Sequence, residues 1–384
     1  MSFCDRKSED LEWLVLALRS RPIAQGIEAL GVLWAKRPSE AWRDLARRNH
    51  VECATGAGVE RALGREALDA DWRAQLDLNE ARVEALVATL SAVVTRLDRA
   101  GIAHTVIEGG GVTLCASPSL RGYDSRDFDV LVPCERFQEA LEIVQAEGFK
   151  PSDRRGRPTV RIECVRRAGD EHQWIEIGCE QFDRMWIPVH FEERAQAWLA
   201  RRTPLPTRAP LYVFDPSDAM VSVAVHTSMH TFIHPPGLRL YTDIERLAAA
   251  FPIDWQHVVD EARGMRAATR VLMALQLAQE LFALPIPPFV FEQLCVDAER
   301  ARSIATRIGG EGLLASGRGK LRGLTRVAVD RALDDRGNRA WLSDLLIPST
   351  SWMRRHFDRS GEGASIFSLH TRRLQEGVRA WWRP

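Results

Sequence analysis

Apolar residues recur every three or four positions along most of the chain, a spacing that predicts helices. The segment 79–100 shows it most clearly, with one apolar stripe made of Val83, Leu86, Val87, Leu90, Val93, Val94 and Leu97. Asn79 can cap the start of this helix, and Gly101 lies where a helix is expected to end. Residues 1–78 and 216–384 carry similar patterns. We therefore expect helical regions at both ends of the chain.

Between these regions the pattern changes to short apolar runs and strict alternation, which predict β-strands. Residues 102–107 form one apolar run and 127–132 form a second. Two alternating runs, 159–166 and 173–178, are joined by an Ala-Gly-Asp turn and predict a hairpin. Because strands and helices are mixed here, we expect an α+β core over 79–215 between the two helical regions.

Two aspartates open the second of these strands. Side chains alternate between the faces of a strand, so Asp127 and Asp129 point to one side while Phe128 points into the sheet. Neighbouring carboxylates repel each other unless a cation lies between them, and ligands made only of oxygen suit Mg²⁺ or Mn²⁺. The pair therefore predicts a divalent-metal site. The alternative is a strand end whose aspartates cap a neighbouring helix.

Three consecutive glycines, Gly109, Gly110 and Gly111, follow the apolar run 102–107. We expect them to form a loop, with a short helix over 112–116 directly after it. Backbone N–H groups of such a loop, beside a helix N-terminus, can bind an anion such as a triphosphate. The spacing matches neither a P-loop nor a dinucleotide-binding fingerprint. As a simple turn the triplet would carry no function.

Four more residues could complete a nucleotide site. Arg121, Ser125 and Arg126 lie in the linker before the aspartates, and a guanidinium binds phosphate through planar, bidentate hydrogen bonds. Phosphoryl transfer with two metal ions usually needs a third acidic ligand on a neighbouring strand. Glu176, an acid in an apolar strand, is the candidate for it, and a solvent-facing strand glutamate is the alternative.

A pair of histidines lies in the helix predicted after residue 215. His226 and His230 are four positions apart and could share a zinc ion. Thr227 stands where a zinc protease would have its glutamate, so a packing role is the favoured interpretation. His190 and Asp243 are also polar residues in apolar surroundings, able to form internal hydrogen bonds or to orient a substrate.

Composition excludes several classes of protein. The 384 residues are 45% apolar and 27% charged, as in ordinary globular proteins, and their formal net charge is zero. A neutral chain has no overall field that draws it to nucleic acid or to an anionic membrane. The seven cysteines are scattered without Cys-x-x-Cys spacing, which indicates reduced thiols and a cytoplasmic location. We find no signal peptide and no apolar stretch fit to span a membrane.

The order of these features resembles the DNA polymerase β-like nucleotidyltransferase superfamily, in which a Gly-Gly or Gly-Ser turn precedes an Asp-x-Asp strand. The longer pattern is similar to one branch, an uncharacterised nucleotidyltransferase family often encoded beside genes for peptide natural products. Similar segments extend along nearly the whole chain, at 42–51, 100–110, 121, 127–132, 174–177, 215–230, 239–247 and 346–355. Two positions depart from the family pattern: Glu108 replaces a lysine and Gly178 replaces a histidine.

The resemblance implies a polymerase β-like nucleotidyltransferase core, a small mixed sheet with helices, flanked by helical N- and C-terminal regions. It implies an enzyme that moves a nucleoside monophosphate from an NTP, with ATP the expected donor, to a hydroxyl of a small molecule or peptide. Mg²⁺ or Mn²⁺ would be held by Asp127, Asp129 and Glu176, which would also act in catalysis. The nucleotide would contact Gly109, Gly110, Gly111, Arg121, Ser125 and Arg126. Residues expected beside these groups or at the acceptor are Glu108, His190, His226, His230 and Asp243.

Three alternatives stay open. The same site could pass a γ-phosphoryl group to the acceptor, in which case the product is a nucleoside diphosphate. Glu108 could instead mark a degenerate site in a protein that binds a partner without catalysis. A zinc hydrolase built on His226 and His230 is the third. The sequence predicts neither the acceptor nor the oligomeric state.

Overall fold

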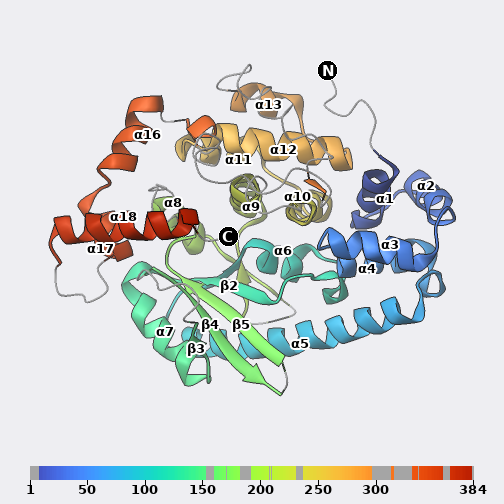
Figure 1. Ribbon diagram of the computed structural model, residues 1–384, viewed down its shortest axis with the longest axis horizontal. Coiled ribbons are helices and arrows are strands. Elements are labelled where there is room, and N and C mark those ends of the chain that lie inside the picture. The colour runs from blue at the N-terminus through green and yellow to red at the C-terminus, as the bar shows by residue number, and fades with distance from the viewer. Residues whose placement is uncertain are drawn as a thin grey trace. The chain divides into compact units, whose positions relative to one another are not determined.

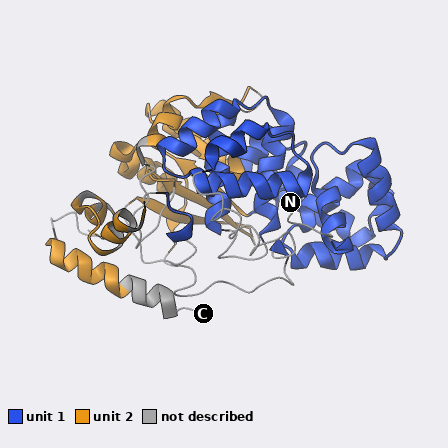
Figure 2. Cartoon of the chain, turned by 90° about the horizontal axis from the view of Figure 1, so that it is seen from above, with its two compact units in different colours: residues 1–87, 112–125, 216–335 blue, residues 88–111, 126–215, 336–384 orange. Residues whose placement is uncertain are grey.

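The structure is a computed structural model that describes residues 8–152, 160–169, 171–181, 192–206, 208, 210–230, 237–295, 313–314, 331–335, 337–357 and 364–382. The chain divides into two compact units (Figure 2). The first unit consists of residues 1–87, 112–125 and 216–335, and the second of residues 88–111, 126–215 and 336–384. The first unit thus combines the N-terminal segment with residues 216–335, and the second contains the sheet and the C-terminal segment.

The N-terminal part of the first unit is helical. It comprises α1 (Glu9–Leu18), α2 (Ala24–Trp34), α3 (Ser39–Arg48), α4 (Glu52–Leu63), the 3-10 turn η1 (Arg65–Ala67) and the start of α5 (Ala70–Arg99). Trp13 stacks on Trp42 with ring centroids 4.5 Å apart, and Trp34 lies 6.1 Å from Trp13 and from Trp72. These indoles bury a large apolar area between the helices. The predicted helical N-terminal flank is therefore confirmed.

The rest of the first unit is built around α9 (Pro216–His230), most of whose side chains are buried. The helices that pack against it are α10 (Leu238–Ala250), α11 (Trp255–Gly264) and α12 (Ala268–Phe282), and α13 (Pro288–Leu294) packs on α11 and α12 (Figure 1). A helix enclosed on several sides needs apolar residues around most of its circumference. The sequence of α9 provides them, with Met220, Val221, Ala224 and Val225 all fully buried.

Helix α5 begins earlier than its apolar stripe predicts. Asp69 caps it by accepting the backbone N–H of Trp72 at 2.8 Å, so the helix starts at Ala70. Asn79 is therefore an interior residue and not a cap. Its side-chain amide donates instead to the carbonyl oxygens of Arg121 and Tyr123, at 2.9 and 3.0 Å.

The second unit contains a mixed sheet of seven strands in the order β3-β4-β5-β2-β1-β7-β6. The strands are β1 (Thr105–Ile107), β2 (Asp127–Leu131), β3 (Lys150–Pro151), β4 (Arg161–Ala168), β5 (Glu171–Gly178), β6 (Thr203–Pro204) and β7 (Tyr212–Val213). β2 lies antiparallel to β1 and parallel to β5, and β4 lies antiparallel to β5. The α+β fold with a sheet core and helical flanks is thus confirmed.

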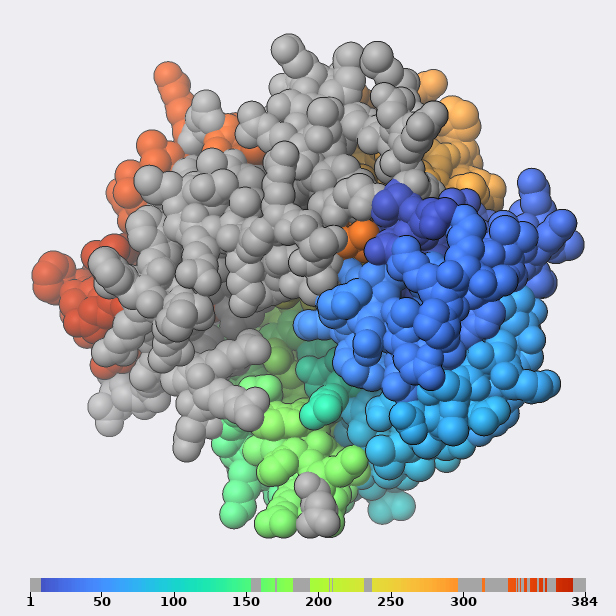
Figure 3. Space-filling view, turned by 45° about the vertical axis from the view of Figure 1, so that its right-hand side comes forward, coloured from blue at the N-terminus to red at the C-terminus, as the bar shows by residue number. Residues whose placement is uncertain are grey.

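The predicted hairpin is formed by β4 and β5 (Figure 1). Burial alternates over residues 174–177 of β5, where Ile175 and Ile177 are fully buried and face the layer that contains α7 (Phe137–Ala146). Trp174 and Glu176 lie on the other face. The turn end of the hairpin is exposed, and its atoms are visible in green in the lower part of Figure 3.

The C-terminal segment of the second unit contains three helices among the residues described: α16 (Gly337–Leu346), α17 (Thr350–Phe357) and α18 (Ile366–Trp382). α17 and α18 pack through a small apolar cluster of Trp352, Met353, Phe357 and Leu369. α8 (Glu192–Ala200) also belongs to this unit. Among the residues described, no helix combines the length and apolarity needed to cross a bilayer.

Candidate active site

Three predicted acids lie together on one face of the sheet. Asp127 and Asp129 flank Phe128, which is fully buried, so both carboxylates point away from the apolar layer. In the parallel register of β2 and β5, Asp129 pairs with Glu176 and Asp127 pairs with Trp174. Side chains at paired positions of neighbouring strands point to the same face. The sheet therefore places the carboxylates of Asp127, Asp129 and Glu176 side by side, as an oxygen-only donor set that suits a small divalent cation.

A guanidinium lies among these carboxylates. Arg161, the first residue of β4, donates from Nη2 to Asp129 Oδ1 at 2.7 Å and from Nε to Glu176 Oε1. Its Nη1 and Nη2 are each 3.3 Å from Glu108 Oε1, and Nη1 also donates to the carbonyl oxygen of Gln181. All four charged side chains are largely buried, with exposed fractions of 11% for Arg161, 10% for Glu108, 15% for Asp129 and 13% for Glu176.

Negative charge exceeds positive charge in this cluster. Burial raises the pKa of Asp129 well above its ordinary value, and repulsion from Glu108 adds to that effect, while Arg161 opposes it. Burial disfavours the charge of Arg161, but attraction to Glu176, Glu108 and Asp129 raises its pKa well above the ordinary value. One guanidinium thus balances only part of the charge of the surrounding carboxylates.

The three glycines do not form the predicted loop. Helix α6 (Glu108–Ala116) begins directly after β1, so Gly109, Gly110 and Gly111 form its first turn. Glu108 itself is left-handed, with φ of 57°, which is uncommon for a residue with a side chain. A Cβ on Gly111 would lie 2.6 Å from the carbonyl oxygen of Val106. The glycine sequence therefore permits an abrupt change from strand to helix, and it still leaves first-turn amides at a helix N-terminus.

Arg121 is held by carboxylates of its own unit. It lies in the 3-10 turn η2 (Leu120–Gly122), where Nη1 donates to both carboxylate oxygens of Glu60, at 2.9 and 2.7 Å. Nε and Nη2 donate to Glu80, at 3.0 and 2.7 Å, and Nη2 lies 3.1 Å from Asp77. Contact with a phosphate would require this guanidinium to leave these acids. The predicted phosphate contact of Arg121 stays a prediction.

The linker before β2 also contains Asp124, Ser125 and Arg126. Arg126 is exposed, and Ser125 accepts a hydrogen bond from Arg82 Nη2 at its carbonyl oxygen, at 2.9 Å. Sequence reasoning overlooked Asp124, which accepts the backbone N–H groups of Cys53 and Ala54 at 2.8 and 2.9 Å. The Asp124 carboxylate thus caps α4 from a distant part of the sequence.

Sequence reasoning also overlooked Arg161. A signal was available, because Arg161 begins the strand that forms a hairpin with the strand of Glu176. In the observed register Glu176 pairs with Glu163, and positions 161 and 163 share a face of β4. Counting residue pairs outward from the predicted turn would therefore have placed Arg161 beside Glu176.

Among the residues that the structure describes, the predicted histidine pair belongs to no group with metal-ligand spacing. The rings of His226 and His230 stack with centroids 4.4 Å apart. Asp243 lies on α10, where burial raises the pKa of its carboxyl group against the opposing attraction of Arg246 and of Arg239. Arg246 Nη1 donates to Asp243 Oδ1 at 3.3 Å. His190 lies outside the described residues.

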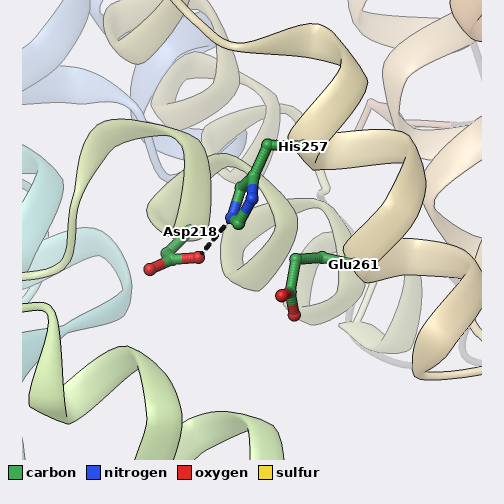
Figure 4. Close-up of side chains that lie close together, drawn as sticks. All are labelled: Asp218, His257 and Glu261. Atoms are coloured by element: carbon green, nitrogen blue, oxygen red, sulfur yellow. Dashed lines mark hydrogen bonds and ion pairs between the residues drawn. The ribbon is translucent and has the colours of Figure 1, made fainter.

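A different group in the helical unit has metal-ligand spacing. Within the residues that the structure describes, Asp218, His257 and Glu261 bring one ligand atom each to within 4.8 Å of one another (Figure 4). His257 Nε2 is 2.7 Å from Asp218 Oδ1, and the Asp218 side chain is fully buried. The backbone N–H of His257 also donates to Asp254, which caps α11. These contacts explain the group as a hydrogen-bonded link between α9 and α11, which could also hold a small cation.

One comparison with known proteins gives a match. A family described as uncharacterised nucleotidyltransferases matches residues 38–283, well over half of the chain. The matched region extends from α3 to α12 and includes the whole sheet with its acid cluster. A search of curated proteins gives no match. On the length of this family match and the mixed α+β fold, the chain belongs to the uncharacterised nucleotidyltransferase family.

Proposed function

We propose that this protein transfers a nucleoside monophosphate from an NTP, with ATP the expected donor, to a hydroxyl of a small molecule or peptide. The observation that carries the proposal is the pairing of Asp129 with Glu176 across β2 and β5, with Asp127 on the same face. The family membership supports the general reaction class. A cytoplasmic location fits the free cysteines found among the residues described.

The donor set fits a divalent cation. Asp127, Asp129 and Glu176 offer carboxylate oxygens on one face of the sheet. Burial and, after it, repulsion from Glu108 raise the pKa of Asp129, and a cation would stabilise its charged form. Mg²⁺ or Mn²⁺ bound there would act as a Lewis acid that stabilises negative charge on the transferring phosphoryl group.

The chain's own residues would position the nucleotide and move one proton. First-turn amides of α6 at Gly109, Gly110 and Gly111 would donate to phosphate oxygens. Arg126, which is exposed, and Ser125 are the proposed polar contacts of the nucleotide. Arg121 would join them only after leaving Glu60 and Glu80. Glu108, the first residue of α6, would lie beside these groups.

The proposed reaction exchanges one bond to phosphorus for another. The acceptor hydroxyl oxygen bonds to the α-phosphorus, and the bond from that phosphorus to the bridging oxygen of the β-phosphate breaks. Pyrophosphate leaves with the electrons of the broken bond. Glu176 accepts the hydroxyl proton, which requires its carboxylate to be free of Arg161 at that moment.

Labelled nucleotides test this proposal. The protein is incubated with cell extract, Mg²⁺ or Mn²⁺ and each NTP carrying label on either the α- or the γ-phosphate. We expect transfer of α-label with release of pyrophosphate, and loss of transfer in Asp127→Asn and Asp129→Asn. Asp98→Asn, which changes an exposed aspartate of α5, is the matched control and should keep wild-type activity. Transfer of γ-label with a nucleoside diphosphate product would instead indicate a phosphotransferase.

One observation favours a second candidate, a nucleotidyltransferase-fold protein that binds a partner without catalysis. The guanidinium of Arg161 already contacts the acids proposed to hold the cation. Calorimetric titration with NTP and Mg²⁺ separates the two candidates. Heat of binding at millimolar nucleotide supports the enzyme, and no heat supports the binding protein.

A further inference from the structure

Arg161 contacts acids that the proposed function assigns to a metal ion. Its guanidinium contacts Glu108, Asp129 and Glu176, and two of these acids belong to the proposed donor set. A carboxylate oxygen that accepts a short, charge-assisted hydrogen bond cannot offer the same lone pair to a metal ion. A divalent cation beside a guanidinium would also be repelled by it.

We propose that Arg161 is a resident counter-ion that closes the acid cluster to free divalent cations, so that metal enters together with the nucleotide. This inference rests on the proposed function, because it assigns the metal to the same three acids. In the absence of nucleotide, the guanidinium occupies carboxylate oxygens of Asp129 and Glu176 and offsets part of their charge. A triphosphate offers a planar guanidinium an alternative anion, and the carboxylates are then released to the metal.

Because the cluster is buried, the release of Arg161 from the acids and the binding of the metal ion depend on each other. Arg161 is 11% exposed and Asp129 is 15% exposed, so water cannot fully replace either partner when the contact breaks. Removing Arg161 from Asp129 without a substitute anion leaves a buried charge uncompensated. A metal ion alone compensates the carboxylates but not the guanidinium, whereas a metal–triphosphate complex compensates both.

Glu108 strengthens the same arrangement. It holds a left-handed backbone conformation, with φ of 57°, at the junction of β1 and α6. Such a conformation is unfavourable for a residue with a side chain and persists where the surroundings fix it. Here it directs a third carboxylate to the guanidinium, with Oε1 at 3.3 Å from both terminal nitrogens. Glu108 therefore adds to the attraction that keeps Arg161 over the cluster.

The experiment measures Mn²⁺ binding without turnover. Free Mn²⁺ is followed by electron paramagnetic resonance, with and without a non-hydrolysable NTP analogue, for the wild type, Arg161→Gln, Arg161→Lys and Arg167→Gln. Arg167 lies on the same strand at its exposed end and is the matched control. We expect Arg161→Gln to bind Mn²⁺ at least tenfold more tightly than the wild type in the absence of nucleotide, and Arg161→Lys at least threefold.

The nucleotide arm gives a second expected result. The analogue should tighten Mn²⁺ binding strongly in the wild type and much less in Arg161→Gln, because the variant has no guanidinium to redirect. Far-ultraviolet circular dichroism checks folding, and if Arg161→Gln does not fold, Arg161→Lys decides alone. Equal or weaker Mn²⁺ binding by the folded variants overturns the proposal.

A double variant locates the ion and separates this inference from the proposed function. Asp129→Asn combined with Arg161→Gln should lose the gain in affinity. If the gain persists, the ion binds elsewhere, for example at Asp218 and His257, and the inference fails. A gain in metal affinity without any nucleotide transfer would contradict the proposed function alone. Transfer that depends on Asp127, without a gain in the Arg161 variants, would contradict this inference alone.

Discussion

Asp129 and Glu176 occupy paired positions on the parallel strands β2 and β5, and the same guanidinium donates to both. They come from segments about fifty residues apart, which the sheet joins side by side. Their proximity is fixed by strand pairing rather than by loops, so small changes at either position should act on a rigid arrangement.

We expect Glu176→Gln to lower nucleotide transfer by roughly 10²–10⁴-fold, because an amide neither accepts the hydroxyl proton nor balances a cation. Glu171→Gln is the matched control, since Glu171 lies at the exposed start of the same strand. The measurement is the initial rate with α-labelled NTP. Equal rates for the two variants would remove Glu176 from the proposed mechanism.

Gly111→Ala should destabilise the second unit. The added Cβ would lie 2.6 Å from the Val106 carbonyl oxygen, which is backbone and cannot rotate away. We expect a loss of about 1–3 kcal/mol in the free energy of unfolding, the usual cost of overpacking. Gly31→Ala in α2 is the control, because its Cβ would meet a leucine side chain at 3.7 Å. Urea denaturation of both variants provides the comparison, and equal midpoints would show that β1 and α6 can separate.

Arg121→Met should lower the thermal midpoint by about 2–4 °C, because three carboxylates lose their shared guanidinium. Arg65→Met is the control, since Arg65 contacts the same Glu60 and Asp77 but its side chain is 40% exposed against 20% for Arg121. We expect a smaller change for Arg65→Met. If Arg121→Met instead raises the KM for NTP and leaves the thermal midpoint unchanged, its main role is phosphate binding.

Glu245 should make stability depend on pH. Burial raises the pKa of its carboxyl group, although the hydrogen bonds from the backbone N–H and hydroxyl of Ser20 oppose this. The pKa of such an acid is higher in the folded state than in the unfolded state, where it is about 4.3. Its contribution to stability is fully present when the pH is below the pKa of the unfolded state. That contribution is lost as pH rises towards the folded value.

Glu245→Gln should therefore gain stability relative to the wild type between about pH 4.3 and pH 7. Urea midpoints at pH 4.5, 6 and 7.5 measure the difference. Glu28→Gln, at an exposed position of α2, should show no such trend. If the urea midpoint of the wild type instead rises relative to that of Glu245→Gln as pH rises, the hydrogen bonds from Ser20 outweigh burial.

Local pattern was enough for much of the fold. The alternation around Phe128 and Ile175 predicted which side chains of β2 and β5 are buried, because one-sided burial of a strand leaves a period of two in the sequence. The start of α5 was missed because the apolar stripe identified in the sequence begins at Val83, whereas the helix begins at Ala70. Its cap, Asp69, is a polar residue outside that stripe.

The sequence by itself determined the family, the α+β class and the acids at 127, 129 and 176 that carry the proposed chemistry. Tertiary structure alone decided that Arg161 also contacts Glu108 and Asp129 and that Arg121 is held by Glu60 and Glu80. The physical reason is that an ion pair between distant segments leaves no periodic trace in a sequence. It depends on strand register and on which carboxylates folding brings within reach of a guanidinium.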